Sequence, residues 1–370
     1  MSGAASGADD RRFMALALGL AARCLGNVWP NPAVGCVIVR GGRIVGRGWT
    51  QPGGRPHAET VALAQAGAHA RGATAYVTLE PCAHHGKTPP CTDALIAAGV
   101  ARVVTALTDP DPRVAGGGHD RLRAAGIALA EGIMAAEAGQ VNAGFLSRVT
   151  RGRPHLTLKL ATTLDGRIAT VTGESRWITG PEARRHVHAL RMQSDAVMIG
   201  AGTARADDPE LTARDMGARH QPVRVVLDSR LSLDPGNRLG RTVGEVPVWL
   251  CHGPDAPACR RAEWQAAGAR LIPVPMGDLG LDIHAVLAAL AEAGLTRVMC
   301  EGGARLAAAL VNAELVDEIW IYSAGRILGG DALAAIGPLG IRRMPQGRPA
   351  FRMIAQDWLG DDLFSRWLRR

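Results

Sequence analysis

Short apolar runs alternate with helix-like segments along the whole chain, and this alternation constrains the fold most. The first half predicts strands at 34–39, 43–49, 73–79, 101–107 and 127–131. The helices predicted beside them cover 57–68, 89–98, 118–125 and 134–147. The second strand follows directly after Gly41-Gly42, a turn that is typical of a hairpin. Strands that alternate with helices predict a layered α/β domain.

A basic segment, Arg148-Val149-Thr150-Arg151-Gly152-Arg153-Pro154, interrupts the pattern near the middle. Glycine and proline break it and it has no apolar period, so we place a domain boundary between 148 and 149. The pattern then restarts, with strands predicted at 155–161, 195–199, 223–227, 247–251, 270–274, 296–300 and 318–322. Helices are predicted at 181–192, 281–293 and 303–313. The chain of 370 residues therefore predicts two α/β domains, 1–148 and 149–370.

Composition excludes several classes of protein. With 47% hydrophobic and 21% charged residues, the chain is not mainly disordered. The net charge of +8 is spread along the sequence, which suits an anionic ligand such as a phosphate and does not require nucleic acid. No apolar stretch reaches the ~18 residues that a membrane span needs. Seven irregularly spaced cysteines argue against a disulfide framework and favour the reducing cytoplasm, with a metal or thiol site.

The residues with the most specific spacing are His57-Ala58-Glu59, Pro81-Cys82 and Cys91. One imidazole and two thiolates suit Zn²⁺, and three protein ligands leave a fourth position open for water. Zinc lowers the pKa of such a water towards ~7. Glu59 need not bind metal, so it is free to move a proton from the water to a leaving amine. This pattern predicts a hydrolytic zinc site.

The spacing imposes a geometric condition on the first motif. In the middle of a helix, positions 57 and 59 point in nearly opposite directions. They share a site only where a helix begins, and Pro56 is consistent with a beginning at His57. Cys91 follows Pro89-Pro90 and is also predicted at a helix N-terminus, where the helix dipole favours a thiolate.

Two other interpretations of this cluster stay open. A purely structural zinc site would need a fourth ligand, which His84 or His85 could supply. The three side chains could also be ordinary core residues with no metal. The cysteines outside the cluster are predicted to be core thiols: Cys24, Cys36, Cys251, Cys259 and Cys300.

The His-x-Glu and Pro-Cys motifs resemble those of zinc deaminases of nucleobases, although the second cysteine comes later here. The segment Asn31-Pro32-Ala33-Val34-Gly35 lies upstream of these motifs, and eight residues separate Cys82 from Cys91. With these features, the first half of the chain resembles the deaminase part of the bifunctional riboflavin-biosynthesis deaminase/reductase family. The resemblance implies a cytidine-deaminase-like domain. It implies that His57, Cys82 and Cys91 are zinc ligands and that Glu59 is the proton shuttle.

The second half lacks the Gly-x-Gly-x-x-Gly motif of a Rossmann fold. Two glycine-bearing turns, Gly200-Ala201-Gly202-Thr203 and Glu301-Gly302-Gly303, follow predicted strands. Small residues there let backbone N–H groups approach a phosphate. Each turn taken alone is more typical of a plain strand-to-helix connection.

Longer strings carry a resemblance to the reductase domain of the same family. They are Leu158 to Arg167, Gly173 to Thr179 and Ala206 to Thr212. The resemblance implies a dihydrofolate-reductase-like fold that uses NADPH. It implies cofactor contacts at Ala161, Trp177, Thr203, Asp207, Ser229 and Gly303. It implies substrate contacts at Ser175, Arg191, Leu211, Arg214 and Glu301.

These roles are physically reasonable. Arg191 and Arg214 could each hold a sugar phosphate through paired hydrogen bonds. Glu301 could accept hydrogen bonds from ring N–H groups of a pyrimidine, or it could simply complement a helix dipole. Asp207 could position an opening ribose, or it could be an ordinary turn residue. The proton donor of the reduction stays open between Asp207, Lys159 and water.

We therefore expect a bifunctional enzyme that deaminates a diaminopyrimidinone ribosyl phosphate at zinc and then reduces its ribosyl chain with NADPH. The family resemblance also implies that the enzyme is a homodimer. A deaminase that edits nucleic acid is a competing hypothesis, although arginines are not clustered and aromatic residues are scarce. A non-catalytic zinc scaffold is a second, and the presence of Glu59 argues against it. An enzyme with only one active half is a third.

Overall fold

The computed structural model describes residues 7–84, 89–111, 115–218, 220–278, 280–346 and 350–370. The chain divides into two compact units, one ending at Gly152 and one beginning at Arg153. The sequence places the boundary between 148 and 149, but helix α6 (Ala143–Arg151) continues through those positions. It ends at Gly152, whose positive φ of 66° is typical of the residue that closes a helix.

The first unit is built on a five-stranded sheet in the order β2-β1-β3-β4-β5. The strands are β1 (Gly35–Arg40), β2 (Arg43–Trp49), β3 (Thr74–Val77), β4 (Arg102–Thr105) and β5 (Ala128–Ala130). The hairpin β1–β2 and the pair β1–β3 are antiparallel, whereas β3, β4 and β5 run parallel.

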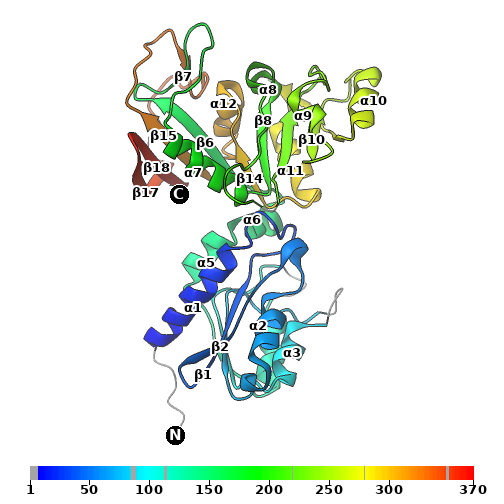
Figure 1. The fold of residues 1–370 in the computed structure, drawn as a ribbon, viewed down its shortest axis with the longest axis vertical. Helices are drawn as coiled ribbons and strands as arrows, with labels where there is room; N and C mark the ends of the chain where they lie inside the picture. The colour runs from blue at the N-terminus through cyan, green and yellow to red at the C-terminus, as the bar shows by residue number, and fades with distance from the viewer. Residues whose placement is uncertain (1–6, 85–88, 112–114, 219, 279, 347–349) are drawn as a thin grey trace. The chain divides into compact units, whose positions relative to one another are not determined.

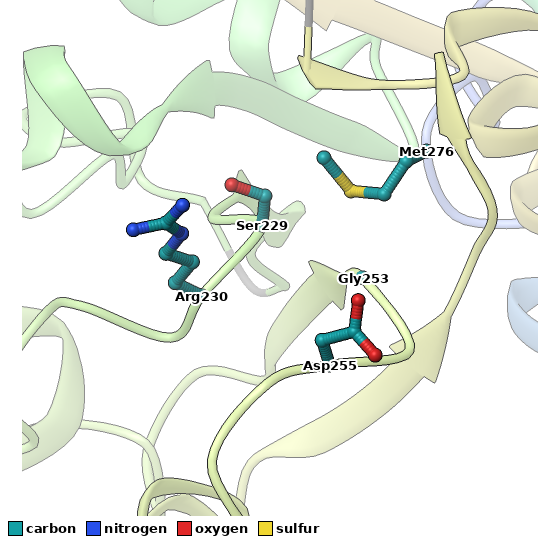
Figure 2. Close-up of a pocket in the computed structure, with 5 residues that line it drawn as sticks. All are labelled: Ser229, Arg230, Gly253, Asp255 and Met276. Carbon is teal, nitrogen blue, oxygen red and sulfur yellow. The ribbon is translucent and has the colours of Figure 1, made fainter.

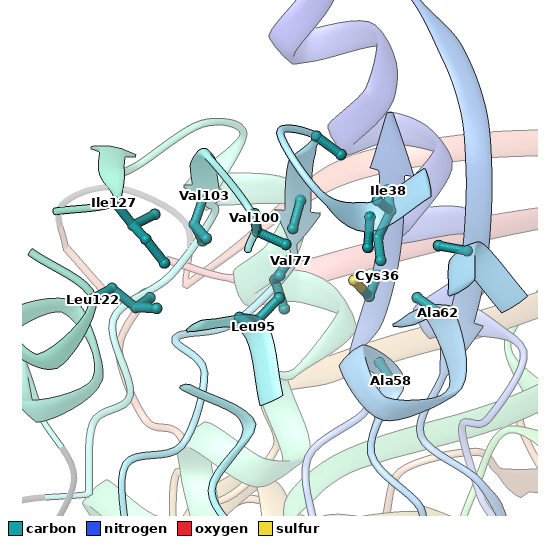
Figure 3. Packing of buried hydrophobic residues seen from close by; sticks show 14 of the residues in the cluster. Cys36, Ile38, Ala58, Ala62, Val77, Leu95, Val100, Val103, Leu122 and Ile127 are labelled. Carbon is teal, nitrogen blue, oxygen red and sulfur yellow. The ribbon is translucent and has the colours of Figure 1, made fainter. Parts of the chain in front are cut away.

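Helices cover both faces of this sheet (Figure 1). They are α1 (Gly7–Ala22), α2 (Ala58–Ala66), α3 (Cys91–Ala97), α4 (Gly117–Ala124), α5 (Ala135–Val141) and α6. Ile38 and Val77 point to one face and pack with Leu95 of α3, as Figure 3 shows. Their neighbours Val37 and Tyr76 point to the other face and pack against α1. This alternation buries the strands between two helical layers.

The second unit contains a nine-stranded sheet in the order β11-β10-β9-β8-β14-β6-β15-β18-β17. Its strands are β6 (His155–Thr163), β8 (Ala196–Gly200), β9 (Val223–Leu227), β10 (Val248–His252), β11 (Arg270–Pro273), β14 (Arg297–Cys300), β15 (Glu318–Ala324), β17 (Phe351–Leu359) and β18 (Asp362–Arg369). The strands from β11 to β15 are parallel, and only β17 and β18 are antiparallel additions.

The helices of this unit are α7 (Pro181–Met192), α8 (Ala201–Asp207), α9 (Arg238–Arg241), α10 (Ala258–Ala267), α11 (Ile283–Glu292) and α12 (Ala304–Asn312). Two small ribbons pair β7 (Arg167–Ala169) with β16 (Leu333–Ala334) and β12 (Met276–Gly277) with β13 (Gly280–Leu281). Helix α7 shares a buried cluster with Met299, whereas Trp264 of α10 shares one with Val197. Met299 and Val197 are paired across β14 and β8, so both helices lie on one face of the sheet.

The order of the strands predicts a ligand site at the ends of β8 and β14. From β8 the chain continues to β9, towards one edge of the sheet, whereas from β14 it continues to β15, on the other side of β6. Ligands of open parallel sheets bind outside the carboxyl ends of the strands at such a switch point. The residues after Gly200 and Cys300 therefore lie where a ligand site is expected.

The predicted α/β class is confirmed for both halves, but several elements differ. The helix predicted at 134–147 is two helices, because Asn142 turns its side chain to the backbone of Ala33. The hairpin of β17 and β18 and helices α8, α9 and α10 are not in the prediction. Among the described residues, no helix is both long and apolar enough to cross a bilayer.

Candidate active sites

The three predicted zinc ligands meet in the first unit. His57 is the residue that caps the N-terminus of α2, and Cys91 is the first residue of α3. The His57 Nδ1 atom lies 3.3 Å from the Cys91 Sγ atom and 3.7 Å from the Cys82 Sγ atom. Zn–N and Zn–S bonds at a tetrahedral angle would separate such atoms by about 3.5 Å. The donor set therefore fits zinc in both chemistry and spacing.

The surroundings of Cys82 favour its thiolate. Hydrogen bonds from the Cys91 thiol and from His57, together with the backbone N–H of Cys91 at 3.4 Å, hold the pKa of Cys82 well below its usual range. The same Cys82 sulfur raises the pKa of Cys91, as does burial. A thiolate beside a helix N-terminus is a ready metal ligand.

Glu59 lies in the first turn of α2, directly beside the cluster. Its side chain is buried, and burial raises the pKa of its carboxyl group. A carboxyl group with a raised pKa is suited to pick up and release a proton near neutral pH. Residues 57 and 59 can share a site only where a helix begins, and they do lie at the start of α2.

The described residues do not support the alternative of a structural zinc site with a fourth protein ligand. His84 is exposed and is not part of the group formed by His57, Cys82 and Cys91. His85 lies outside the described residues. Three protein ligands are typical of a catalytic zinc site, in which one position stays open.

Sequence reasoning missed Glu80, two residues before Cys82. Its buried carboxylate accepts hydrogen bonds from the backbone N–H groups of Asp109, Gly116, Gly118 and His119, at 2.8–3.3 Å. Glu80 thereby fixes the segment that follows β4 against the strand end that carries Cys82. An acidic residue beside Pro81-Cys82 was the only available sequence indication.

In the second unit, two predicted substrate residues form a buried ion pair. Arg191, in the last turn of α7, donates to Glu301 from Nε at 2.6 Å and from a terminal nitrogen at 3.0 Å. The Lys159 Nζ atom lies 3.8 Å from the same carboxylate. Burial acts to raise the pKa of Glu301, but the two cations lower it to about 2. Glu301 is therefore a charged acceptor at neutral pH, at the carboxyl end of β14.

The two glycine-bearing turns meet across the switch point. The backbone N–H of Gly303 donates to the Thr203 hydroxyl at 2.9 Å, which joins the turn after β14 to the turn after β8. A Cβ atom on Gly302 would lie 2.7 Å from Leu306 and 3.3 Å from the Gly200 nitrogen. Only a residue without a side chain allows this close approach of the two turns, and the N-terminus of α12 that follows is a type of site that suits a pyrophosphate.

The remaining predicted residues surround this turn less closely. Asp207 ends α8, and its carbonyl accepts a hydrogen bond from Arg176 at 2.6 Å, which brings the segment of Ser175 and Trp177 beside α8. Burial raises the pKa of Asp207. Ala161 lies on β6, and the exposed Trp177 ring lies under the Arg184 guanidinium.

Leu211 and Arg214 follow α8. Leu211 is buried and has a positive φ of 58°, whereas Arg214 pairs with Glu210 at 2.5 Å. Arg191 also donates to the Thr212 carbonyl at 2.8 Å, which ties this segment to the Glu301 ion pair. Ser229 follows β9 and lines a pocket with Arg230, Gly253, Asp255 and Met276, shown in Figure 2. The last four are residues that sequence reasoning missed.

Comparison with known proteins gives the family. Residues 8–107 match the cytidine and deoxycytidylate deaminase zinc-binding region, and residues 154–356 match the RibD C-terminal domain. The riboflavin biosynthesis protein RibD of Escherichia coli is 44% identical over 96% of this chain and 98% of its own. The chain belongs to the RibD family. It is therefore an enzyme of riboflavin biosynthesis that joins a zinc deaminase domain to a reductase domain.

Solved structures of RibD proteins agree over the full length. Acinetobacter baumannii RibD matches with a TM-score of 0.89 and 38% identity, covering 99% of this chain and all of that one. A deaminase/reductase from Thermotoga maritima matches with a TM-score of 0.86 and 33% identity, covering 98% and 99% of the two chains. The predictions of family, fold class, bifunctional enzyme, zinc and NADPH are confirmed, and the individual residue roles stay predictions.

Proposed function

We propose that this RibD enzyme carries out two consecutive reactions on one pyrimidine ribosyl phosphate. The Thermotoga maritima relative is described as a diaminohydroxyphosphoribosylaminopyrimidine deaminase and 5-amino-6-(5-phosphoribosylamino)uracil reductase. We assign the same two substrates to this chain. The observation that carries the proposal is the cluster of His57, Cys82 and Cys91 with buried Glu59, in a chain whose second half is a RibD C-terminal domain.

In the first reaction, water replaces the ring amine of 2,5-diamino-6-(5-phosphoribosylamino)pyrimidin-4(3H)-one. His57, Cys82 and Cys91 would hold zinc, which when bound supplies an acidified water as the nucleophile. Glu59 accepts a proton from that water and delivers it to the amine nitrogen, so that ammonia leaves as the C–N bond breaks. The raised pKa of the Glu59 carboxyl group supports this transfer in both directions.

In the second reaction, the ribosyl chain is reduced to a ribityl chain, giving 5-amino-6-(5-phosphoribitylamino)uracil. NADPH supplies the hydride when bound, and we assign its contacts to Ala161, Trp177, Thr203, Asp207, Ser229 and Gly303. The first carbon of the ribose gains the hydride, and the ring oxygen gains a proton as the C–O bond opens. Glu301 would accept hydrogen bonds from the pyrimidine, since its carboxylate is charged and firmly held.

We assign the remaining substrate contacts to Ser175, Arg191, Leu211 and Arg214. Arg191 acts mainly by fixing Glu301, because its guanidinium is already engaged by that carboxylate. Arg214 is half exposed and pairs with a surface carboxylate, so it can exchange Glu210 for a substrate phosphate. We also propose that the enzyme works in the cytoplasm as a homodimer, consistent with its seven free cysteines.

Product mass analysis tests the proposal. Zinc-loaded enzyme would receive the diaminopyrimidinone ribosyl phosphate with or without NADPH. Without NADPH, we expect exchange of an amine for an oxo group alone. With NADPH, we expect two further hydrogens in the product. If neither change occurs in folded, zinc-loaded protein, the proposal is wrong.

A further inference from the structure

Glu80 carries a buried carboxylate that neither of the two proposed reactions uses. It lies three residues after β3 and two residues before Cys82. A buried carboxylate without partners would be costly, because burial penalises charge. Glu80 is instead satisfied by four backbone N–H groups, which donate to it at 2.8–3.3 Å. Its carboxylate therefore joins two separate parts of the first unit.

Two of the four donors belong to the beginning of α4. The N–H groups of Gly118 and His119 donate to the Oε1 atom of Glu80 at 2.8 and 3.3 Å. The first N–H groups of a helix have no partner within the helix, and a helix N-terminus favours a negative charge. Gly116 precedes α4 and has no side chain that could cap it. Glu80 therefore supplies the missing acceptor from a different segment.

Close packing holds α4 against the same segment. A Cβ atom on Gly118 would lie 2.1 Å from the Pro81 carbonyl oxygen and 3.0 Å from the Glu80 side chain. That carbonyl belongs to the peptide bond between Pro81 and Cys82. The first turn of α4 therefore lies directly on the peptide that leads to a predicted zinc ligand.

Helix α4 is also joined to α3, which begins with the second cysteine of the cluster. Arg121 of α4 pairs with Asp93, in the first turn of α3, at 2.6 Å. The backbone N–H and the hydroxyl group of Thr92 both donate to the Cys82 carbonyl, each at 3.2 Å. The two cysteine-bearing segments therefore contact each other and share α4 as a common support. Glu80 is the buried contact between α4 and the segment of Cys82.

We propose that Glu80 is a positioning residue for the zinc site. By holding α4 on residues 80–82, it determines where the Cys82 sulfur lies relative to the Cys91 sulfur. The proposal rests on the proposed zinc ligands His57, Cys82 and Cys91. Residues that hold metal ligands in place from behind typically change metal affinity about 10- to 100-fold when they are replaced. Glu80 thus contributes to zinc affinity without touching the metal.

Zinc affinity tests the proposal without any turnover. The full-length Glu80→Gln protein and the native protein would each compete for zinc with a chromophoric chelator. The amide of glutamine keeps one accepting oxygen but turns N–H donors towards backbone N–H groups, so part of the contact with α4 is lost. We expect zinc affinity to fall about 10- to 100-fold. With Co²⁺ in place of zinc, the ligand-field spectrum should also change, because it reports the geometry of the ligands and not the stability of the fold.

Glu131→Gln is the matched control. Glu131 also contacts α4, at 3.2 Å from the His119 Nδ1 atom, but its side chain is partly exposed. We expect the zinc affinity of this variant to stay within about 2-fold of the native value, as for the loss of a surface ion pair. Equal losses in Glu80→Gln and Glu131→Gln, or equal zinc affinities of Glu80→Gln and native protein, would overturn the role of Glu80.

Arg121→Gln decides the matter if Glu80→Gln does not fold. It removes the link between α4 and α3 at a partly exposed position and leaves Glu80 in place. We expect zinc affinity to fall about 2- to 5-fold, with a changed Co²⁺ spectrum. An unchanged affinity and spectrum would overturn the role of α4 as a support. A native protein that binds no zinc would instead overturn the proposed function, which separates the two failures.

Discussion

Glu59 and Glu301 are both buried carboxyl groups, but their surroundings shift their pKa values in opposite directions. Burial raises the pKa of Glu59. Burial acts in the same direction on Glu301, but Arg191 and Lys159 outweigh it and lower the pKa to about 2. One carboxyl group is therefore suited to carry protons and the other to stay charged as a fixed acceptor. The two halves of the chain therefore place a glutamate in opposite electrostatic surroundings.

The role of Glu59 can be tested by removing its ability to carry a proton. We expect Glu59→Gln to lower the rate of deamination by at least about 10²-fold, the usual contribution of a general acid–base group. Zinc content, measured by elemental analysis, should not change because the ligands are intact. Reduction of the deaminated substrate by the same preparation is the internal control. Undiminished deamination would exclude Glu59 as the proton carrier.

The Arg191–Glu301 pair makes a prediction about stability and pH. Arg191→Leu leaves a buried charge without its bidentate partner, so we expect a loss of about 3–5 kcal/mol in the free energy of unfolding at pH 7. The lowered pKa of Glu301 means that its pairing stabilises the fold above its ordinary pKa near 4.5 and is lost towards pH 2. Urea unfolding at several pH values should therefore show native and variant protein converging as the pH falls.

Arg214→Gln is the matched control for that measurement. Arg214 also pairs with a glutamate, but both side chains are partly exposed to solvent. A surface ion pair contributes ~0–1 kcal/mol. A loss as large as that of Arg191→Leu would contradict the burial argument.

At the scale of elements, close packing of α2 on β2 determines where His57 lies. Gly48 of β2 faces the first turn of α2, and a Cβ atom there would lie 2.1 Å from the Ala58 carbonyl oxygen. Gly46 meets the Ala62 carbonyl in the same way, at 2.2 Å. Because His57 caps this helix, any outward movement of α2 also moves a predicted zinc ligand.

Two glycine-to-alanine substitutions in the first unit should therefore have opposite effects. Gly48→Ala should destabilise the unit by about 1–3 kcal/mol through overpacking and should lower its zinc affinity. Gly19→Ala lies in α1, where nothing occupies the space of the new Cβ atom, so it should stabilise by about 0.5–1 kcal/mol. Thermal unfolding and a zinc titration check both. Equal effects of the two substitutions would show that packing of α2 on β2 does not position the ligand.

The sequence predicts those elements whose pattern is strong. Apolar runs locate β8, β9, β10 and β14, and the motif spacing brings His57, Cys82 and Cys91 together. Helix α10 is missed because Trp264 is its one fully buried side chain, so it has no apolar period. The hairpin of β17 and β18 is missed because most of β17 is exposed at the sheet edge.

The residues of the sites divide in the same way, into those that a sequence pattern indicates and those that it does not. Motifs predict the residues that could hold the metal, and resemblance predicts those around NADPH. Glu80 and the pocket around Arg230 depend on turns that meet only after folding, so no local spacing indicates them. The Arg191–Glu301 pair connects α7 with the end of β14, and its two members are predicted separately but not as partners.

At the scale of the whole molecule, each half has its own sheet, core and ligand chemistry. This separation predicts that the two halves respond to different ligands. A ligand stabilises only the unit that binds it. We expect two thermal transitions in calorimetry, of which a zinc chelator lowers one and NADPH raises the other. If both ligands shifted one single transition, the prediction that the two units unfold independently would be wrong.

Chelation should also separate the two activities. Removing zinc should abolish deamination, whereas reduction of the deaminated substrate with NADPH should continue at its original rate. Adding zinc back should restore deamination. Loss of both activities on chelation would show that the metal supports the second unit as well.

The position of β6 has a consequence for synthesis on the ribosome. It is the first strand of the second unit, but its neighbours in the sheet are β14 and β15, and β15 is in turn paired with β18 at the end of the chain. All strands of the first unit lie before residue 152, so that unit can fold while translation continues. A nascent chain that stops before β14 would therefore carry all strands of the first unit, together with a strand β6 that still lacks both of its neighbours in the sheet.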